Sequence, residues 1–121
     1  MIKQLALVKL FHEKFHALIS EKPSLILPDR SDLRYRLMKD EVEEYLEGVK
    51  KRDLENIAHE LGDILYAVYG TIIEHGLQDK MEDIFAEIHR SNMSKDYSEY
   101  KMIKGPHYTK ADLRAFLKDD G

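Results

Sequence analysis

The sequence predicts an all-α protein, an antiparallel bundle of four main helices followed by a short C-terminal helix. Three observations predict this class. Apolar residues recur at helical spacing over long stretches, proline and glycine number only 3 and 6, and residues suited to helix caps stand at the ends of those stretches. At 121 residues the chain is expected to form one domain spanning residues 1–121.

We expect the first two helices on either side of a proline-containing loop. The first covers about residues 2–20, where apolar side chains form a broad stripe. Ser31 is suited to cap the start of the second helix, about residues 32–47, and Gly48 is suited to its C-terminal cap.

The third predicted helix is strongly apolar. Asp53 can cap its start, and it should continue to about residue 75 and stop at Gly76. Residues 64–73 include no charged side chain, and a helix that is apolar nearly all round must be covered on more than one side. In so short a chain we expect a second subunit to cover it, in a homodimer or homotetramer.

The last two predicted helices are shorter. The fourth covers about residues 79–90, and the stretch after it is polar and loses helical periodicity. Thr109 with Asp112 resembles a capping box for a last helix that ends near residue 118.

Composition excludes several classes of function. The formal charge of −4 argues against broad nucleic-acid binding, and the absence of cysteine excludes disulfides and thiolate chemistry. No apolar run approaches 18 residues and the N-terminus does not resemble a signal peptide, so we expect no membrane partner and a cytoplasmic location.

Two acidic pairs at helical i, i+3 spacing are the main functional signal. They are Glu41 with Glu44 and Glu60 with Asp63, and each interrupts an apolar stripe. If the two helices pack antiparallel, the four carboxylates meet, and a pair about 5 Å apart repels by roughly 3 kcal/mol. Oxygen ligands of this kind favour Mg²⁺, with Mn²⁺ as a substitute.

A simpler alternative is solvated surface charge, because acidic pairs at this spacing are common in helices. Two pairs that both continue apolar stripes favour a site. Gly62 lies inside the second pair, and a glycine within a helix costs about 1 kcal/mol relative to alanine, so we expect close packing or an approaching ligand to offset it.

These pairs occur within a longer pattern that resembles the MazG-like, all-α nucleotide pyrophosphohydrolase superfamily. The resemblance covers about residues 5–108 and is closest to the phosphoribosyl-ATP pyrophosphohydrolase-like branch. Besides the acidic pairs, the segments that carry it are residues 11–16, 34–38, 60–66, 89–95 and 104–106.

The resemblance implies Mg²⁺-dependent hydrolysis of a nucleoside triphosphate to the monophosphate and pyrophosphate, in the removal of unwanted nucleotides. It implies that Glu41 and the other three acids hold the metal and that Asp40 acts on the attacking water. By this resemblance, Asp40 stands where many members of the superfamily have glutamate. The residues that it implies for nucleotide binding are Asn92, Lys95, Lys104 and Arg34.

Two other functions fit the same residues. One is hydrolysis of phosphoribosyl-ATP in histidine biosynthesis, which would use the same carboxylates. The other is a helical dimer that binds metal or nucleotide without catalysis, an alternative raised by the aspartate at position 40.

A competing motif lies in the first helix. His12, Glu13 and His16 satisfy the H-E-x-x-H pattern of zinc metalloproteases. The pattern is short and arises by chance, and a protease needs a third ligand and a cleft. We therefore interpret the two histidines as packed or capping residues, and Tyr66 and Tyr69 as core or interface residues.

Overall fold

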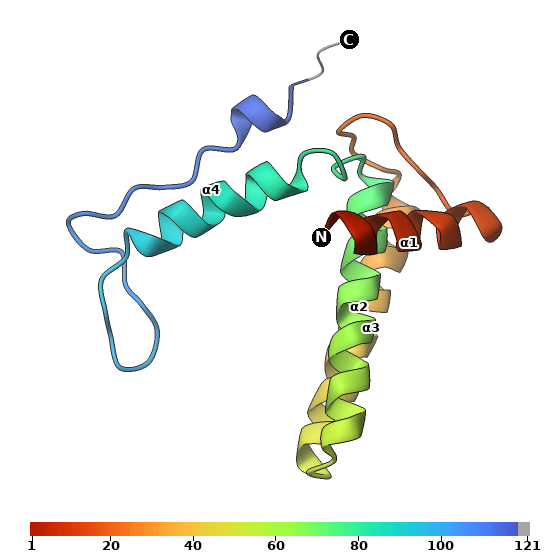
Figure 1. Ribbon diagram of the computed structural model, residues 1–121, viewed down its shortest axis with the longest axis horizontal. Helices are drawn as coiled ribbons and strands as arrows, with labels where there is room; N and C mark the ends of the chain where they lie inside the picture. The colour runs from red at the N-terminus through yellow and green to blue at the C-terminus, as the bar shows by residue number, and fades with distance from the viewer. Residues whose placement is uncertain (119–121) are drawn as a thin grey trace. The chain divides into compact units, whose positions relative to one another are not determined.

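The computed structural model describes residues 1–118, and within them the chain is all-helical, which confirms the predicted class (Figure 1). The chain divides into two compact units, Met1–Gln78 and Asp79–Gly121. The expectation of one domain over residues 1–121 stays a prediction, and its last three residues lie outside the described part. The helices are α1 (Ile2–Lys14), α2 (Pro28–Lys50), α3 (Leu54–Glu74) and α4 (Met81–Met93), followed by the 3-10 turn η1 (Arg114–Phe116).

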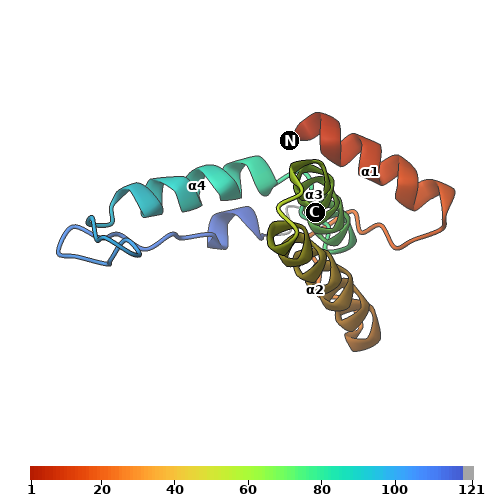
Figure 2. The same cartoon turned by 90° about the horizontal axis from the view of Figure 1, so that it is seen from below.

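The central helix of the first unit is α3. It packs along the antiparallel helix α2 on one side and against α1 on another, as Figure 2 shows with α2 and α3 seen near their ends. Its buried apolar side chains lie at the C-terminal half, where they meet α1; those of the whole unit are Leu5, Val8, Ile72 and Ile73. This packing places one face of α2 against one face of α3 over most of their length.

The ends of α3 confirm the predicted caps. Asp53 is the N-cap residue, and its Oδ1 accepts a hydrogen bond from the backbone N–H of Asn56 at 3.2 Å. At the other end Gly76 has φ +68°, and a β-carbon there would collide with the backbone of Lys22. Glycine is therefore the residue that this turn requires.

The second helix is longer than predicted at both ends. It begins at Pro28, whose fixed φ and missing N–H suit the first helical position, so Ser31 lies inside the first turn instead of capping it. The helix also continues through Gly48 to Lys50. Gly48 is buried, and a β-carbon there would lie 2.7 Å from Asn56 Nδ2, so this glycine allows α3 to approach rather than ending α2.

The first helix is shorter than predicted, because it ends at Lys14 and not near residue 20. His16 takes a left-handed backbone conformation with φ 57°, and the chain turns away. The following loop binds the C-terminal end of α3: Ser20 Oγ donates to the carbonyl of Glu74 at 2.7 Å, and Ser24 N–H donates to that of His75 at 2.8 Å. The loop thus satisfies carbonyl groups that a helix end leaves free.

In the second unit, α4 begins and ends two to three residues later than predicted, and the chain then runs back beside it (Figure 1). Arg90 Nη1 donates to Thr109 Oγ1 at 2.7 Å, and Glu87 Oε2 accepts from the backbone N–H of Asp112 at 2.8 Å. Because α4 engages Thr109 and Asp112 in this way, they do not form the predicted capping box, and only the short turn η1 replaces the last helix.

Candidate metal centre and adjoining pocket

The four acidic residues singled out in the sequence lie on facing sides of α2 and α3. Glu41 and Glu44 are one helical turn apart on α2, and Glu60 and Asp63 are one turn apart on α3. Since the two helices are antiparallel, the pairs meet at the same depth. One carboxylate oxygen from each residue lies within 4.8 Å of those of the other three.

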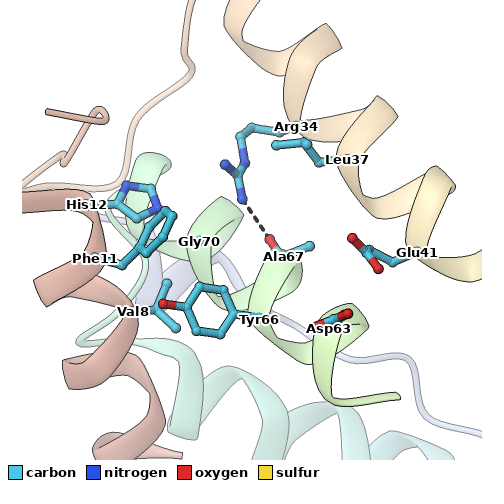
Figure 3. A pocket seen from close by; sticks show the side chains of 10 residues that line it. All are labelled: Val8, Phe11, His12, Arg34, Leu37, Glu41, Asp63, Tyr66, Ala67 and Gly70. Atoms are coloured by element: carbon cyan, nitrogen blue, oxygen red, sulfur yellow. Dashed lines mark hydrogen bonds between the residues drawn. The ribbon is translucent and has the colours of Figure 1, made fainter. Parts of the chain in front are cut away.

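The four carboxylates differ in their exposure to water. Glu60 is buried with 8% of its surface exposed, Glu41 and Asp63 are half-buried, and Glu44 is exposed. Figure 3 shows the carboxylates of Glu41 and Asp63 facing one another across the space between the helices. The cluster is therefore a shallow site open to solvent on the Glu44 side.

Crowding of negative charge changes the acidity of the site. Burial, and then the charge of Glu44, raises the pKa of Glu41 to about 7. A hydrogen bond shared with Glu60, and then the charge of Glu60, raises the pKa of Glu44. Both shifts mean that the metal-free cluster holds protons more tightly than isolated glutamates do.

The donor set fits a hard divalent cation. Two buried oxygens, Glu41 Oε2 and Glu60 Oε2, have no hydrogen-bond partner among the described residues. His59 lies beside the cluster, with its Nε2 3.1 Å from Asp63 Oδ2 on the exposed side. Unsatisfied buried carboxylate oxygens without a nitrogen or sulfur ligand in the cluster are the chemistry that suits Mg²⁺ or Mn²⁺.

A pocket of about 250 Å³ adjoins the cluster and is lined from α1, α2 and α3 (Figure 3). Glu41 and Asp63 form part of its wall. Much of the remaining wall is apolar or aromatic, and the rings of Phe11 and Tyr66 meet edge to face with centroids 5.5 Å apart. The full lining is Val8, Phe11, His12, Arg34, Leu37, Glu41, Asp63, Tyr66, Ala67 and Gly70.

Two further predicted residues lie on α2 near the cluster. Asp40 is exposed and is not one of the four grouped carboxylates, but its charge contributes to the raised pKa of Glu44. Arg34 is buried in the wall of the pocket, where it is bound by α3. If Arg34 contacts the substrate as predicted, its side chain does so while held in place by α3.

The other predicted substrate-binding residues belong to the second unit. Asn92 is exposed in the last turn of α4, and Lys95 follows that helix. Lys104 follows an isolated antiparallel β-bridge between Asp96 and Ile103, and its Nζ lies 5.3 Å from the centre of the Tyr108 ring. Contacts of these side chains with a nucleotide stay predictions.

The H-E-x-x-H motif does not form a zinc site in the described residues, because the only cluster of three or more candidate ligands there is the carboxylate cluster. His12 is 2% exposed, and its Nδ1 lies 3.0 Å from the carbonyl of Leu18, whereas His16 is exposed in the turn after α1. His12 is thus a packed residue, as interpreted from the sequence, and it also lines the pocket.

Glu74 and Gly70 were missed by sequence reasoning. Glu74 is fully buried and binds Arg30 and Arg34, and Gly70 lies beneath the Arg34 guanidinium. The sequence did contain a signal for Glu74. Ala67, Gly70 and Glu74 follow Asp63 at helical spacing along one side of the helix, so Glu74 is an acidic residue on an apolar stripe, as the two acidic pairs are.

Comparison with known families agrees with this geometry. The sequence model of the family described as phosphoribosyl-ATP pyrophosphohydrolase matches residues 8–92. The matched segment contains all four carboxylates and every residue that lines the adjoining pocket. No curated protein matches the chain.

Proposed function

Because that match covers more than half of the chain, the protein belongs to the phosphoribosyl-ATP pyrophosphohydrolase family, and we propose that it hydrolyses a nucleoside triphosphate to the monophosphate and pyrophosphate. The family makes it a nucleotide pyrophosphohydrolase. The observation that carries the proposal is the meeting of four carboxylates beside a pocket with aromatic walls. The role proposed for this reaction is the removal of unwanted nucleotides from the nucleotide pool.

Glu41, Glu44, Glu60 and Asp63 would hold one or more Mg²⁺ ions, for which Mn²⁺ could substitute. When bound, the cation supplies positive charge that stabilises the phosphoryl oxygens of the transition state. Water attacks the α-phosphorus, the bond from that phosphorus to the bridging oxygen breaks, and pyrophosphate leaves. Asp40 is proposed to accept the proton of the water, since it lies beside the cluster and is open to solvent.

Asn92, Lys95 and Lys104 are proposed to bind the phosphates or the ribose. Lysine ammonium groups supply point charges, and the asparagine amide offers both a donor and an acceptor. Metal ions held by four carboxylates neutralise only part of the negative charge of a triphosphate, so the ammonium groups of the two lysines suit this substrate.

The test compares two metal-site variants with a matched control. Glu41→Gln and Glu60→Gln should each lower Mg²⁺-dependent pyrophosphate release by more than about a hundredfold. Glu43→Gln removes the same charge from an exposed position on α2 outside the cluster and should leave the rate near that of the wild type. Wild-type rates in both site variants, each with unchanged helical circular dichroism, would refute the site.

Phosphoribosyl-ATP is a second candidate substrate, because the matched family is described by hydrolysis of that compound. The same carboxylates would serve both reactions. Assaying phosphoribosyl-ATP beside all common ribo- and deoxynucleoside triphosphates, with Mg²⁺ and with Mn²⁺, separates the two candidates.

We further propose that the active protein is a homodimer or homotetramer. Leu7, Leu61 and Leu65 expose 62%, 47% and 52% of their surface. A groove of about 210 Å³ between α1 and α3 is lined by Gln4, Leu7, Val8, Gly62, Leu65, Tyr66 and Tyr69. A second copy is the occupant we propose, since a unit with so few buried apolar side chains needs additional cover.

Among the described residues, none of the helices combines the length and the apolar character that a bilayer crossing requires. The cytoplasmic location stays a prediction.

A further inference from the structure

A buried group of charges lies beside the pocket and is not used by the proposed metal site. Glu74 has no exposed surface, and Arg30 binds it with two nitrogens, Nε at 2.5 Å from Oε1 and Nη2 at 2.9 Å from Oε2. Arg34 Nη1 lies 3.0 Å from Oε2. Two guanidinium groups against one carboxylate leave one positive charge in excess, and a charge withheld from water requires another partner.

That partner has to approach Arg34. The Arg30 side chain is 32% exposed, so water can stabilise its charge, whereas the Arg34 side chain is 9% exposed. Arg34 also donates from Nε to Thr71 Oγ1 at 3.1 Å and from Nη2 to the carbonyl of Ala67 at 2.9 Å. Three of its five N–H groups therefore bind neighbours within the described residues, which leaves two for a group in the pocket.

His12 adds an acceptor beside these donors. Its Nδ1 lies 3.0 Å from the carbonyl of Leu18 and 3.8 Å from Glu74 Oε2, and because both neighbours are acceptors, Nδ1 carries the hydrogen. In the neutral ring Nε2 is then an acceptor. Arg34 Nη2 and His12 Nε2 both lie within 3.0 Å of the position that a β-carbon on Gly70 would occupy, and all three residues line the pocket (Figure 3).

We propose that Arg34 and His12 bind the edge of the substrate's base, and that Glu74 is the positioning residue that fixes Arg34 for this contact. The inference rests on the proposed function and names its substrate class: nucleotides whose base presents a free hydrogen-bond acceptor next to a free donor. Glu74 itself does not line the pocket and acts through Arg34.

The size and the walls of the pocket suit a base. Its volume of about 250 Å³ lies below the range of about 300–1,000 Å³ typical for whole drug-sized ligands, so it suits part of a nucleotide. Phe11, Leu37 and Tyr66 offer apolar and aromatic surface for a planar ring. With the base against Arg34, the phosphates lie on the side of Glu41 and Asp63.

This arrangement distinguishes the two candidate substrates. In phosphoribosyl-ATP the adenine N1 carries a second ribose, so the edge that would meet Arg34 and His12 is blocked. A nucleoside triphosphate presents that edge free. The proposed contact with the base therefore favours nucleoside triphosphates over phosphoribosyl-ATP as substrates.

The first test uses a substrate pair. The best triphosphate of the panel is compared with its analogue methylated on the ring nitrogen of the pairing edge, N1 of a purine or N3 of a pyrimidine. The wild type should show a KM for the methylated analogue at least about tenfold higher. Equal KM values for the two compounds would overturn the proposal and leave the metal-site assignment intact.

The second test uses variants of the full-length protein. Glu74→Gln and Arg34→Lys should raise KM for the parent nucleotide by about tenfold or more, with a smaller change in kcat, and should reduce the discrimination against the methylated analogue. Arg36→Lys makes the same change at an exposed position two residues along α2 and should leave both KM values unchanged. A purely structural role of Glu74 predicts a lower active fraction with unchanged KM and unchanged discrimination.

A milder variant keeps the proposal testable if Glu74→Gln fails to fold. Thr71→Val removes an acceptor of Arg34 without leaving a buried charge and should raise KM in the same direction. If no triphosphate is hydrolysed, calorimetric binding of nucleoside monophosphates in EDTA still tests the pocket, with weaker binding expected in Thr71→Val. Unchanged KM or unchanged binding in a folded Thr71→Val variant would overturn the positioning role.

Discussion

Gly70 lies directly beneath the guanidinium of Arg34. A β-carbon at Gly70 would collide with Arg34 Nη2 and would stand 3.0 Å from His12 Nε2. Gly62, two turns earlier on the same helix, has nothing within 4 Å of the corresponding position. Packing against Arg34 and His12 therefore requires glycine at position 70, whereas no atom of this chain requires it at position 62. The close packing expected at Gly62 is not found within this chain.

The two glycines should respond oppositely to alanine. Gly70→Ala should lower the free energy of unfolding by about 1–3 kcal/mol, because Arg34 has to move while Glu74 stays buried. Gly62→Ala should raise it by about 0.5–1 kcal/mol, because alanine favours the helix and meets no atom of the chain. Chemical denaturation measures both. Equal effects at the two positions would contradict this account.

The stability of the metal-free protein should depend on pH through Glu41. Its pKa is raised from 4.5 to about 7 in the folded state, so folding favours the protonated form. The stabilisation is complete below about pH 4.5 and is lost as pH rises through 7. In EDTA, Glu41→Gln should therefore be more stable than the wild type at pH 8, by roughly 1–2 kcal/mol.

The matching measurement is thermal unfolding at pH 5 and pH 8, with EDTA and with Mg²⁺. Mg²⁺ should stabilise the wild type more at pH 8, where the carboxylates are ionised, and should stabilise Glu41→Gln little at either pH. An EDTA stability that does not fall between pH 5 and pH 8 would contradict the crowded cluster. Glu43→Gln serves as the control for loss of one charge from α2.

Asp53 should stabilise α3 through its cap. Asp53→Ala removes the acceptor for the Asn56 N–H and should cost about 1 kcal/mol, whereas Asp53→Ser should retain most of the stability. The loss corresponds to several degrees in Tm for a unit of this size. If the Asp53→Ala and Asp53→Ser variants have the same Tm, the hydrogen bond makes no measurable contribution to stability.

The exposed face of α1 and α3 should govern association. Leu65→Glu places a charge in the apolar groove and should shift the protein towards monomer in light scattering. Leu25→Glu makes the same change at a loop residue that is 97% exposed and should leave the oligomeric state unchanged. A wild-type protein that is monomeric at all concentrations would contradict the proposed second copy.

The position of the acidic cluster followed from spacing alone. Residues three apart share a face of a helix, and two such pairs joined by one turn have to meet when the helices are antiparallel. The ends of α3 were predictable for a similar reason, because Asp53 and Gly76 act within one turn of the backbone. The C-terminal end of α1 and both ends of α2 were predicted wrongly, because the loop before α2 binds the end of α3 and Gly48 serves packing.

What spacing reveals about this protein is local: helical class, caps, and two pairs of carboxylates that share faces. The partnership of Glu74 with Arg30 and Arg34 joins residues about forty positions apart, and nothing in the spacing of either segment indicates it. Only the packing of the helices brings these side chains together, because Glu74 is fully buried and takes its two charged partners from the neighbouring helix α2.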